Sequence, residues 1–226
     1  RLAGHPVYDR LYRDGGVAIA GDTGTNPYRF IPKGVIDHDA RQQWYAYNYD
    51  AQLQPEHLIR YYQTITGIDR VVGDLVAQLE RQGIADNTII IYSSDHGLLN
   101  GEYGTGGKGL LYDLVAKIPL IVYDPRPRSV AAQPDSTRPG STRPENAELV
   151  LSIDVPATIL ALAGVDQPPA MQGRDLNAAQ APRTEVFLES LTVAEGNPFI
   201  EALRTHDWKY VRYLQPQGCP YTEAEL

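Results

Sequence analysis

Cysteine is almost absent from the sequence, since Cys219 is the only one among 226 residues. A single cysteine excludes an internal disulfide framework and any cysteine-rich zinc module. The sequence also lacks an apolar run near the roughly 18 residues that a membrane-spanning helix needs, so we expect no membrane span. We therefore expect the fold to be stabilised by a buried core, for which a chain of this length is sufficient.

Positive charge is scarce as well. The chain has 20 Lys and Arg against 28 Asp and Glu, a formal net charge of -8. A general nucleic-acid binder needs clustered Lys and Arg, and the sequence shows no such cluster, so we expect no nucleic-acid partner. The chain opens at Arg1 with neither an initiator Met nor a signal-peptide pattern, which indicates a fragment of a longer protein.

Helical and strand patterns alternate in the middle of the chain. Apolar residues from Leu58 to Leu79 recur at spacings of three and four, which predicts an amphipathic helix with Pro55 in its first turn and Gly83 as its C-terminal cap. The β-branched run 88–92 predicts a strand buried on both faces of a parallel sheet, and 119–123 predicts a second buried strand. This order is typical of an α/β fold.

The last third of the chain has a different character. Residues 124–148 hold five prolines, which predicts an exposed loop, and Asp154 is the predicted N-cap of a helix that ends at Gly164. The short aromatic and β-branched runs 186–188, 200–203 and 208–213 predict antiparallel strands, the last two joined by a turn at 205–207. We expect one domain over residues 1–176 and a small α+β subdomain over 177–226.

The candidate site begins where the first strand ends. Asp95 and His96 directly follow the run 88–92, and ligands bind at this end of the strands in open α/β sheets. An anionic oxygen and an imidazole on adjacent residues can converge on one metal ion. An Asp-His pair in an arbitrary loop is more often a hydrogen-bonded surface pair, but the position at the strand end favours a metal site.

A glycine-rich stretch follows, and Lys108 stands within it. So many glycines predict sharp turns or a close approach of the backbone to a ligand. An unhindered ammonium is suited to a tetrahedral oxyanion beside the metal. The stretch is not a phosphate-binding P-loop, because Gly109 follows Lys108 where that motif needs Ser or Thr.

Taken together, these segments resemble the second half of the sulfatases, which belong to the alkaline phosphatase superfamily. The resemblance covers most of the chain from residue 55 onward, with its motifs in the family's order: 61–69, 87–97, 101–104, 107–108, 119–121, 153–164, 171–176 and 203–210.

The resemblance implies a three-layer α/β sandwich with a mostly parallel sheet, here incomplete, followed by a small C-terminal antiparallel subdomain. It implies that Asp95 and His96 bind a single divalent cation, usually calcium, and that Lys108 is a catalytic residue that binds the sulfate oxygens and helps to stabilise the leaving group. His96 leaves manganese or zinc open as well, because imidazole is an unusual ligand for calcium. His5, in the dipeptide His5-Pro6, is the candidate for the histidine that contacts the leaving-group oxygen.

The resemblance also shows what this chain does not contain. The family's nucleophile is a formylglycine made within a C-x-P-x-R motif, and Cys219 has the wrong surroundings for it. We therefore expect a C-terminal part of a sulfatase that hydrolyses small-molecule or glycan sulfate esters, and we expect the isolated chain to be inactive.

Two other functions remain open at this point: a phosphate or phosphonate ester hydrolase of the same superfamily, and a non-catalytic module that keeps the cluster without a nucleophile. Exposed sheet edges would favour a homodimer. The resemblance favours a periplasmic or secreted location.

Overall fold

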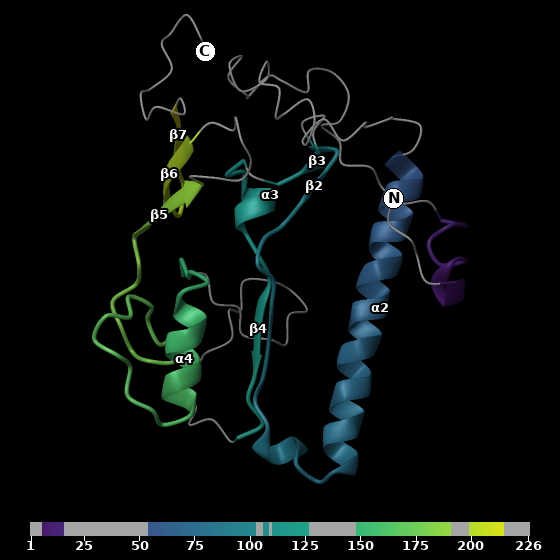
Figure 1. Ribbon diagram of the computed structural model, residues 1–226, viewed down its shortest axis with the longest axis horizontal. Coiled ribbons are helices and arrows are strands. Elements are labelled where there is room, and N and C mark those ends of the chain that lie inside the picture. The colour runs from purple at the N-terminus through teal and green to yellow at the C-terminus, as the bar shows by residue number, and fades with distance from the viewer. Residues whose placement is uncertain are drawn as a thin grey trace, which may run out of the picture. The chain divides into compact units, whose positions relative to one another are not determined.

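The structure, a computed structural model, describes residues 6–15, 54–102, 106–108, 110–126, 148–190 and 199–214 (Figure 1). Two compact units share the chain: Arg1–Arg126 with Ser190–Phe199 and Tyr213–Leu226, and Pro127–Glu189 with Ile200–Arg212. These units are built from interleaved segments, whereas the sequence suggests a single boundary near residue 177, which stays a prediction. Among the described residues, no helix is both long and apolar enough to span a bilayer.

The long helix of the first unit confirms the predicted helix, although Ile65, Ile68 and Leu75 of its apolar stripe are exposed. Helix α2 runs over Gln54–Arg81, with Pro55 in its first turn. Its C-terminal end is a Schellman motif, because the Ile84 N–H donates to the Leu79 carbonyl at 3.1 Å and the Gly83 N–H to the Glu80 carbonyl at 3.0 Å. Gly83 has a φ of +68°, which favours glycine at this position.

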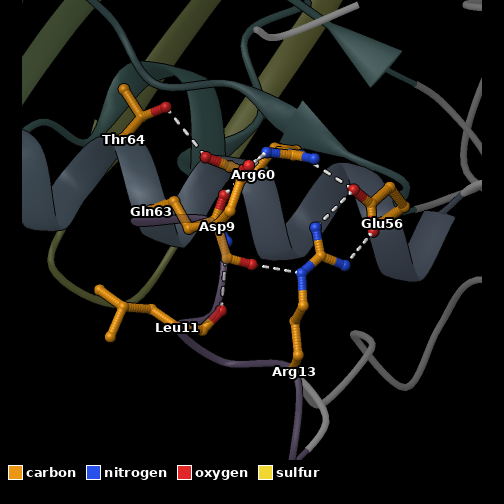
Figure 2. Close-up of polar contacts among 7 residues, drawn as sticks. All are labelled: Asp9, Leu11, Arg13, Glu56, Arg60, Gln63 and Thr64. Atoms are coloured by element: carbon orange, nitrogen blue, oxygen red, sulfur yellow. Dashed lines mark hydrogen bonds and ion pairs between the residues drawn. The ribbon is translucent and has the colours of Figure 1, made fainter. Parts of the chain in front are cut away.

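The segment before the helix is bound to it by charged side chains. The short 3-10 helix η1, Pro6–Tyr8, leads into residues 9–15. Arg13 donates to both carboxylate oxygens of Glu56, at 2.8 and 3.0 Å, and Arg60 bridges Glu56 and Asp9 (Figure 2). The buried Gln63 amide donates to the Leu11 carbonyl at 3.2 Å. The hydrogen bond from Arg13, followed by that from Arg60, lowers the pKa of Glu56 to about 2 against the opposing effect of burial.

A strand pair follows the helix after the 3-10 turn η3, Ala85–Asn87. Strand β1, Ile90–Ser93, pairs with β4, Leu120–Tyr123, and the pairing is antiparallel. The predicted parallel, fully buried arrangement is therefore wrong for these two strands, because β1 is only half-buried and Ile121 and Tyr123 are exposed. The connection over residues 94–119 is long enough for a parallel crossover, but the one helix described in it, α3 at Asp113–Ala116, has four residues, where a parallel crossover usually has a longer helix.

Helix α3 packs directly against the loop that follows β1. The Gly97 N–H donates to the Val115 carbonyl at 2.8 Å. A Cβ at Gly97 would lie 1.9 Å from the Leu114 carbonyl oxygen, which is far inside van der Waals contact. Only glycine fits at this position, and the contact fixes where the β1 loop turns.

Along the chain, a two-stranded ladder follows β1 and precedes α3. Strand β2, Leu99–Asn100, pairs antiparallel with β3, Gly106–Gly107, so that Leu99 faces Gly107 and Asn100 faces Gly106. Leu99 is buried at 2% exposure and anchors the ladder. Gly101 and Gly107 have φ of 117° and 89°, as expected from a glycine-rich stretch that turns sharply.

Helix α4, Asp154–Leu162, belongs to the second unit, and Asp154 is its first residue rather than its N-cap. The predicted capping bond is not made, because the carboxylate is used elsewhere. Oδ2 accepts hydrogen bonds from Arg183 at 2.8 Å and from the Leu151 N–H at 2.7 Å. Oδ1 accepts hydrogen bonds from Arg183 and from the Arg174 N–H, both at 2.9 Å. Asp154 is fully buried. Burial opposes its ionisation, but these four bonds outweigh burial and hold its pKa below the ordinary value.

The remaining strands form one sheet in the order β5-β6-β7, with bounds Glu185–Ser190, Phe199–Thr205 and Lys209–Leu214. Strands β6 and β7 form the hairpin that the sequence predicts. Its turn is closed by the Thr205 N–H, which donates to the Trp208 carbonyl at 2.8 Å, and by the Trp208 N–H, which donates to the Thr205 hydroxyl at 3.1 Å.

Removal of the cation beside Asp154 should destabilise the fold. We expect Arg183→Leu to lower the free energy of unfolding by about 3 to 5 kcal/mol, because it leaves a buried carboxylate unpaired. The matched variant Arg212→Leu breaks the exposed pair with Glu201 and should cost less than about 1 kcal/mol. Urea unfolding at pH 7 measures both.

The Arg183 effect should also depend on pH. Because folding lowers the pKa of Asp154, its contribution is present above the unfolded value and is lost as the pH falls below about 4. Equal losses for the two arginine variants at pH 7 would contradict the assignment of the buried pair.

The Gly97 contact gives a second prediction. Gly97→Ala should destabilise the protein by at least about 1 to 3 kcal/mol, because the new methyl group collides with backbone. Gly73→Ala on α2 is the control: nothing lies within 4 Å of a Cβ there, and alanine should stabilise the helix by up to about 1 kcal/mol. Thermal unfolding measures both changes, and a neutral Gly97→Ala would show that the loop does not need this contact.

Candidate functional site

The loop after β1 has a conformation fixed by its own serines. The Ser93 hydroxyl donates to the Pro119 carbonyl at 3.1 Å and so joins the end of β1 to the start of β4. The Ser94 hydroxyl donates to the His96 carbonyl at 3.0 Å. The loop therefore presents the side chains of Asp95 and His96 from a defined backbone.

The structure brings together three of the four residues that the sequence singles out. Lys108 Nζ lies 2.6 Å from His96 Nε2, and the same ring nitrogen lies 3.3 Å from Asp95 Oδ2. The Asp95 side chain is 82% exposed and that of His96 30%, so the cluster faces solvent and is open to a ligand. The roles that the resemblance gives these residues stay predictions.

The contacts of His96 define its tautomer. Its Nδ1 lies 2.9 Å from the Gly97 carbonyl oxygen, which can only accept, so Nδ1 carries a proton. In the neutral ring Nε2 then has a free lone pair, and it accepts from Lys108. A backbone carbonyl on the other ring nitrogen is also the usual partner of a metal-binding histidine.

The carboxylate of Asp95 is held in its charged form. The His96 N–H donates to Oδ1 at 2.9 Å, and this bond is the largest cause of a lowered Asp95 pKa. Burial opposes this effect as the next-largest cause, and the charge of Lys108 acts in the same direction as the hydrogen bond. Asp95 therefore offers an anionic oxygen as a metal ligand at neutral pH.

Asp95 and His96 fit a divalent cation as two of its ligands. Their facing atoms are 3.3 Å apart, the separation expected for two ligands at right angles on an ion with bonds of about 2.3 Å. Within the described parts of the chain, no third His, Cys, Asp or Glu joins them in a metal-binding group. The pair supplies part of a coordination shell, and carboxylate with imidazole suits manganese or zinc as well as calcium.

Lys108 reaches His96 because it follows the β2–β3 ladder. The ladder is only two residues long on each side, so it needs its flanking contacts. Leu99 anchors one side, and the Asn100 N–H donates to the Glu102 carboxylate at 2.6 Å.

Sequence reasoning missed two polar residues at the start of α2. His57 Nε2 lies 3.3 Å from Asn100 Oδ1, and Gln54 is 5% exposed with a buried amide nitrogen that has no partner. The sequence held a signal for them. A helix that is followed by a short turn and a strand runs antiparallel to that strand, so the start of the helix lies near the end of the strand, where the site is. His5, the fourth predicted residue, lies outside the described residues, as does Cys219.

Residues 5–165, more than half of the chain, match the sulfatase family. One curated relative is the N-acetylglucosamine-6-O-sulfatase of Bacteroides thetaiotaomicron, which is 32% identical over 121 residues, 54% of this chain and 20% of that protein. The chain spans less than a third of the length of the curated relatives that it matches.

Solved structures share the fold. A 2-O GAG sulfatase matches with a TM-score of 0.64 at 19% identity, over 89% of this chain and 45% of that one. A phosphonate monoester hydrolase of Agrobacterium radiobacter matches with a TM-score of 0.60 at 15% identity, over 88% and 45%. The alkaline-phosphatase-like α/β fold that the sequence predicts is thus confirmed, although β1 and β4 run antiparallel. On the match over residues 5–165, the chain belongs to the sulfatase family.

Proposed function

We propose that this chain is the C-terminal part of a sulfuric ester hydrolase that cleaves sulfate monoesters with the help of a divalent cation. The observation that carries the proposal is the cluster at the end of β1. A lysine ammonium lies 2.6 Å from a histidine that, with Asp95, offers two cation ligands 3.3 Å apart. Membership of the sulfatase family supports this role for the cluster.

Lys108 binds the transferring group in this proposal. Its three N–H donors suit the oxygens of a sulfate, and its exposed side chain can exchange the His96 nitrogen for a sulfate oxygen. Negative charge on those oxygens grows as the ester bond breaks, so an ammonium placed there stabilises the transition state more than the bound ester.

Asp95 and His96 hold the cation, which when bound supplies positive charge as a Lewis acid. Asp95 is anionic at neutral pH, and the Gly97 carbonyl keeps the His96 lone pair directed outward on Nε2. The nucleophile, a formylglycine in the family that the chain resembles, comes from outside these 226 residues. The isolated chain should therefore bind but not turn over a sulfate ester.

Sulfated sugars are the substrate class that the relatives favour. One relative is named an N-acetylglucosamine-6-O-sulfatase, and one structural neighbour a 2-O GAG sulfatase. A phosphonate monoester hydrolase shares the fold, so the fold by itself does not choose between the two ester classes. Family membership favours the sulfate ester.

The proposal is tested on the full-length protein with a sulfate ester and a phosphonate monoester of the same alcohol. We expect kcat/KM to be at least tenfold higher for the sulfate. Lys108→Ala should lower kcat/KM for the sulfate by about 10²- to 10³-fold, the usual loss of one charge-stabilising donor. A chelator should abolish turnover, and a divalent cation should restore it.

Lys117→Ala is the matched control, because Lys117 is also exposed and lies outside the cluster, just after α3. It should leave kcat/KM within twofold of the wild-type value. A preference for the phosphonate ester, or equal losses for the two lysine variants, would contradict the proposal.

A further inference from the structure

The first turn of α2 carries two polar side chains, Gln54 and His57, and the amide nitrogen of Gln54 has no hydrogen-bond partner. Gln54 and His57 are three residues apart, so their side chains lie on the same side of the helix. Gln54 is 95% buried, and its Nε2 has no hydrogen-bond partner. A buried N–H group without a partner costs about 1 to 3 kcal/mol, which is unusual enough to need a cause.

His57 connects this turn to the ladder that carries Lys108. Its Nε2 lies 3.3 Å from Asn100 Oδ1, and Asn100 faces Gly106 across the ladder. Lys108 directly follows β3, so the strand that pairs with Asn100 leads into the residue that contacts His96. The first turn of α2 and the ladder lie at the same end of the helix in Figure 1.

The chemistry of this turn favours a ligand rich in oxygen acceptors. The Gln54 amide N–H groups donate, and the N–H groups at a helix N-terminus carry a partial positive charge. The one acidic side chain of the turn, Glu56, is engaged by Arg13 and Arg60 and does not compete for these donors. Sugar hydroxyl and amide oxygens meet this description.

We propose that Gln54 and His57 bind the alcohol part of the sulfate ester, a hydroxyl-bearing sugar ring, while Lys108 holds the sulfate group. The inference rests on the proposed function for the identity of the ester. It assigns Gln54 and His57 to substrate recognition rather than to chemistry.

The test compares two ligands by calorimetry on the full-length protein, treated with a chelator to suppress turnover. The ligands are N-acetylglucosamine 6-sulfate and inorganic sulfate. We expect the wild-type protein to bind the sugar sulfate at least tenfold more tightly than sulfate. Gln54→Leu and His57→Ala should each weaken sugar sulfate binding by about tenfold and leave sulfate binding unchanged, and His206→Ala on the β6–β7 turn should change neither.

Stability separates a binding role from a structural one. Gln54→Leu keeps the side-chain volume and removes the unpartnered N–H, so it should raise the thermal unfolding temperature while it weakens sugar binding. The inference is overturned if the variant loses stability and both affinities together, if its sugar affinity is unchanged, or if the wild-type protein binds the two ligands alike.

The outcomes also separate this inference from the proposed function. Selective loss of sugar binding in a protein that hydrolyses no sulfate ester would sustain the inference and contradict the proposed function. Hydrolysis of the sugar sulfate with an unchanged KM in Gln54→Leu and His57→Ala would support the proposed function and contradict the inference.

Discussion

The candidate site depends on a backbone contact that leaves no room for a side chain. Gly97 lies against α3 so closely that an added Cβ would be 1.9 Å from the Leu114 carbonyl oxygen. Its N–H and carbonyl are both used, the first by Val115 and the second by the His96 ring. One glycine thus fixes the path of the loop and the orientation of the imidazole that the loop carries.

Charged contacts contribute differently to the stability of the two units. Asp154 is fully buried, and its four hydrogen bonds hold the start of α4, residue 174 and residue 183 together. The network around Glu56 is partly exposed, so each of its ion pairs contributes little, about 1 kcal/mol or less. Its effect is to attach residues 9–13 to α2 rather than to stabilise the unit as a whole (Figure 2).

Features that depend on neighbouring residues could be predicted from the sequence. The end of α2 at Gly83 and the β6–β7 turn are local, and so is the Asp95-His96 pair at the end of a strand. Lys108 could be singled out because the surrounding glycines are visible in the sequence.

Features that depend on distant partners could not be predicted. Asp154 has the sequence position of a cap, but Arg183, 29 residues away, takes its carboxylate. The antiparallel direction of β4 is set by its pairing with β1 across residues 94–119, and His57 contacts Asn100, 43 residues along the chain. The pattern of β-branched residues in β1 indicates a strand but carries no information about which partner it takes.

The central claim is that Asp95, His96 and Lys108 form one site for a cation and a sulfate group. The most direct test is a crystal structure of the full-length protein with a divalent cation and inorganic sulfate. The account predicts a cation within about 2.0 to 2.6 Å of Asp95 Oδ2 and His96 Nε2, with Lys108 Nζ turned from the imidazole to a sulfate oxygen. A cation bound elsewhere, with the Lys108–His96 contact intact, would contradict it.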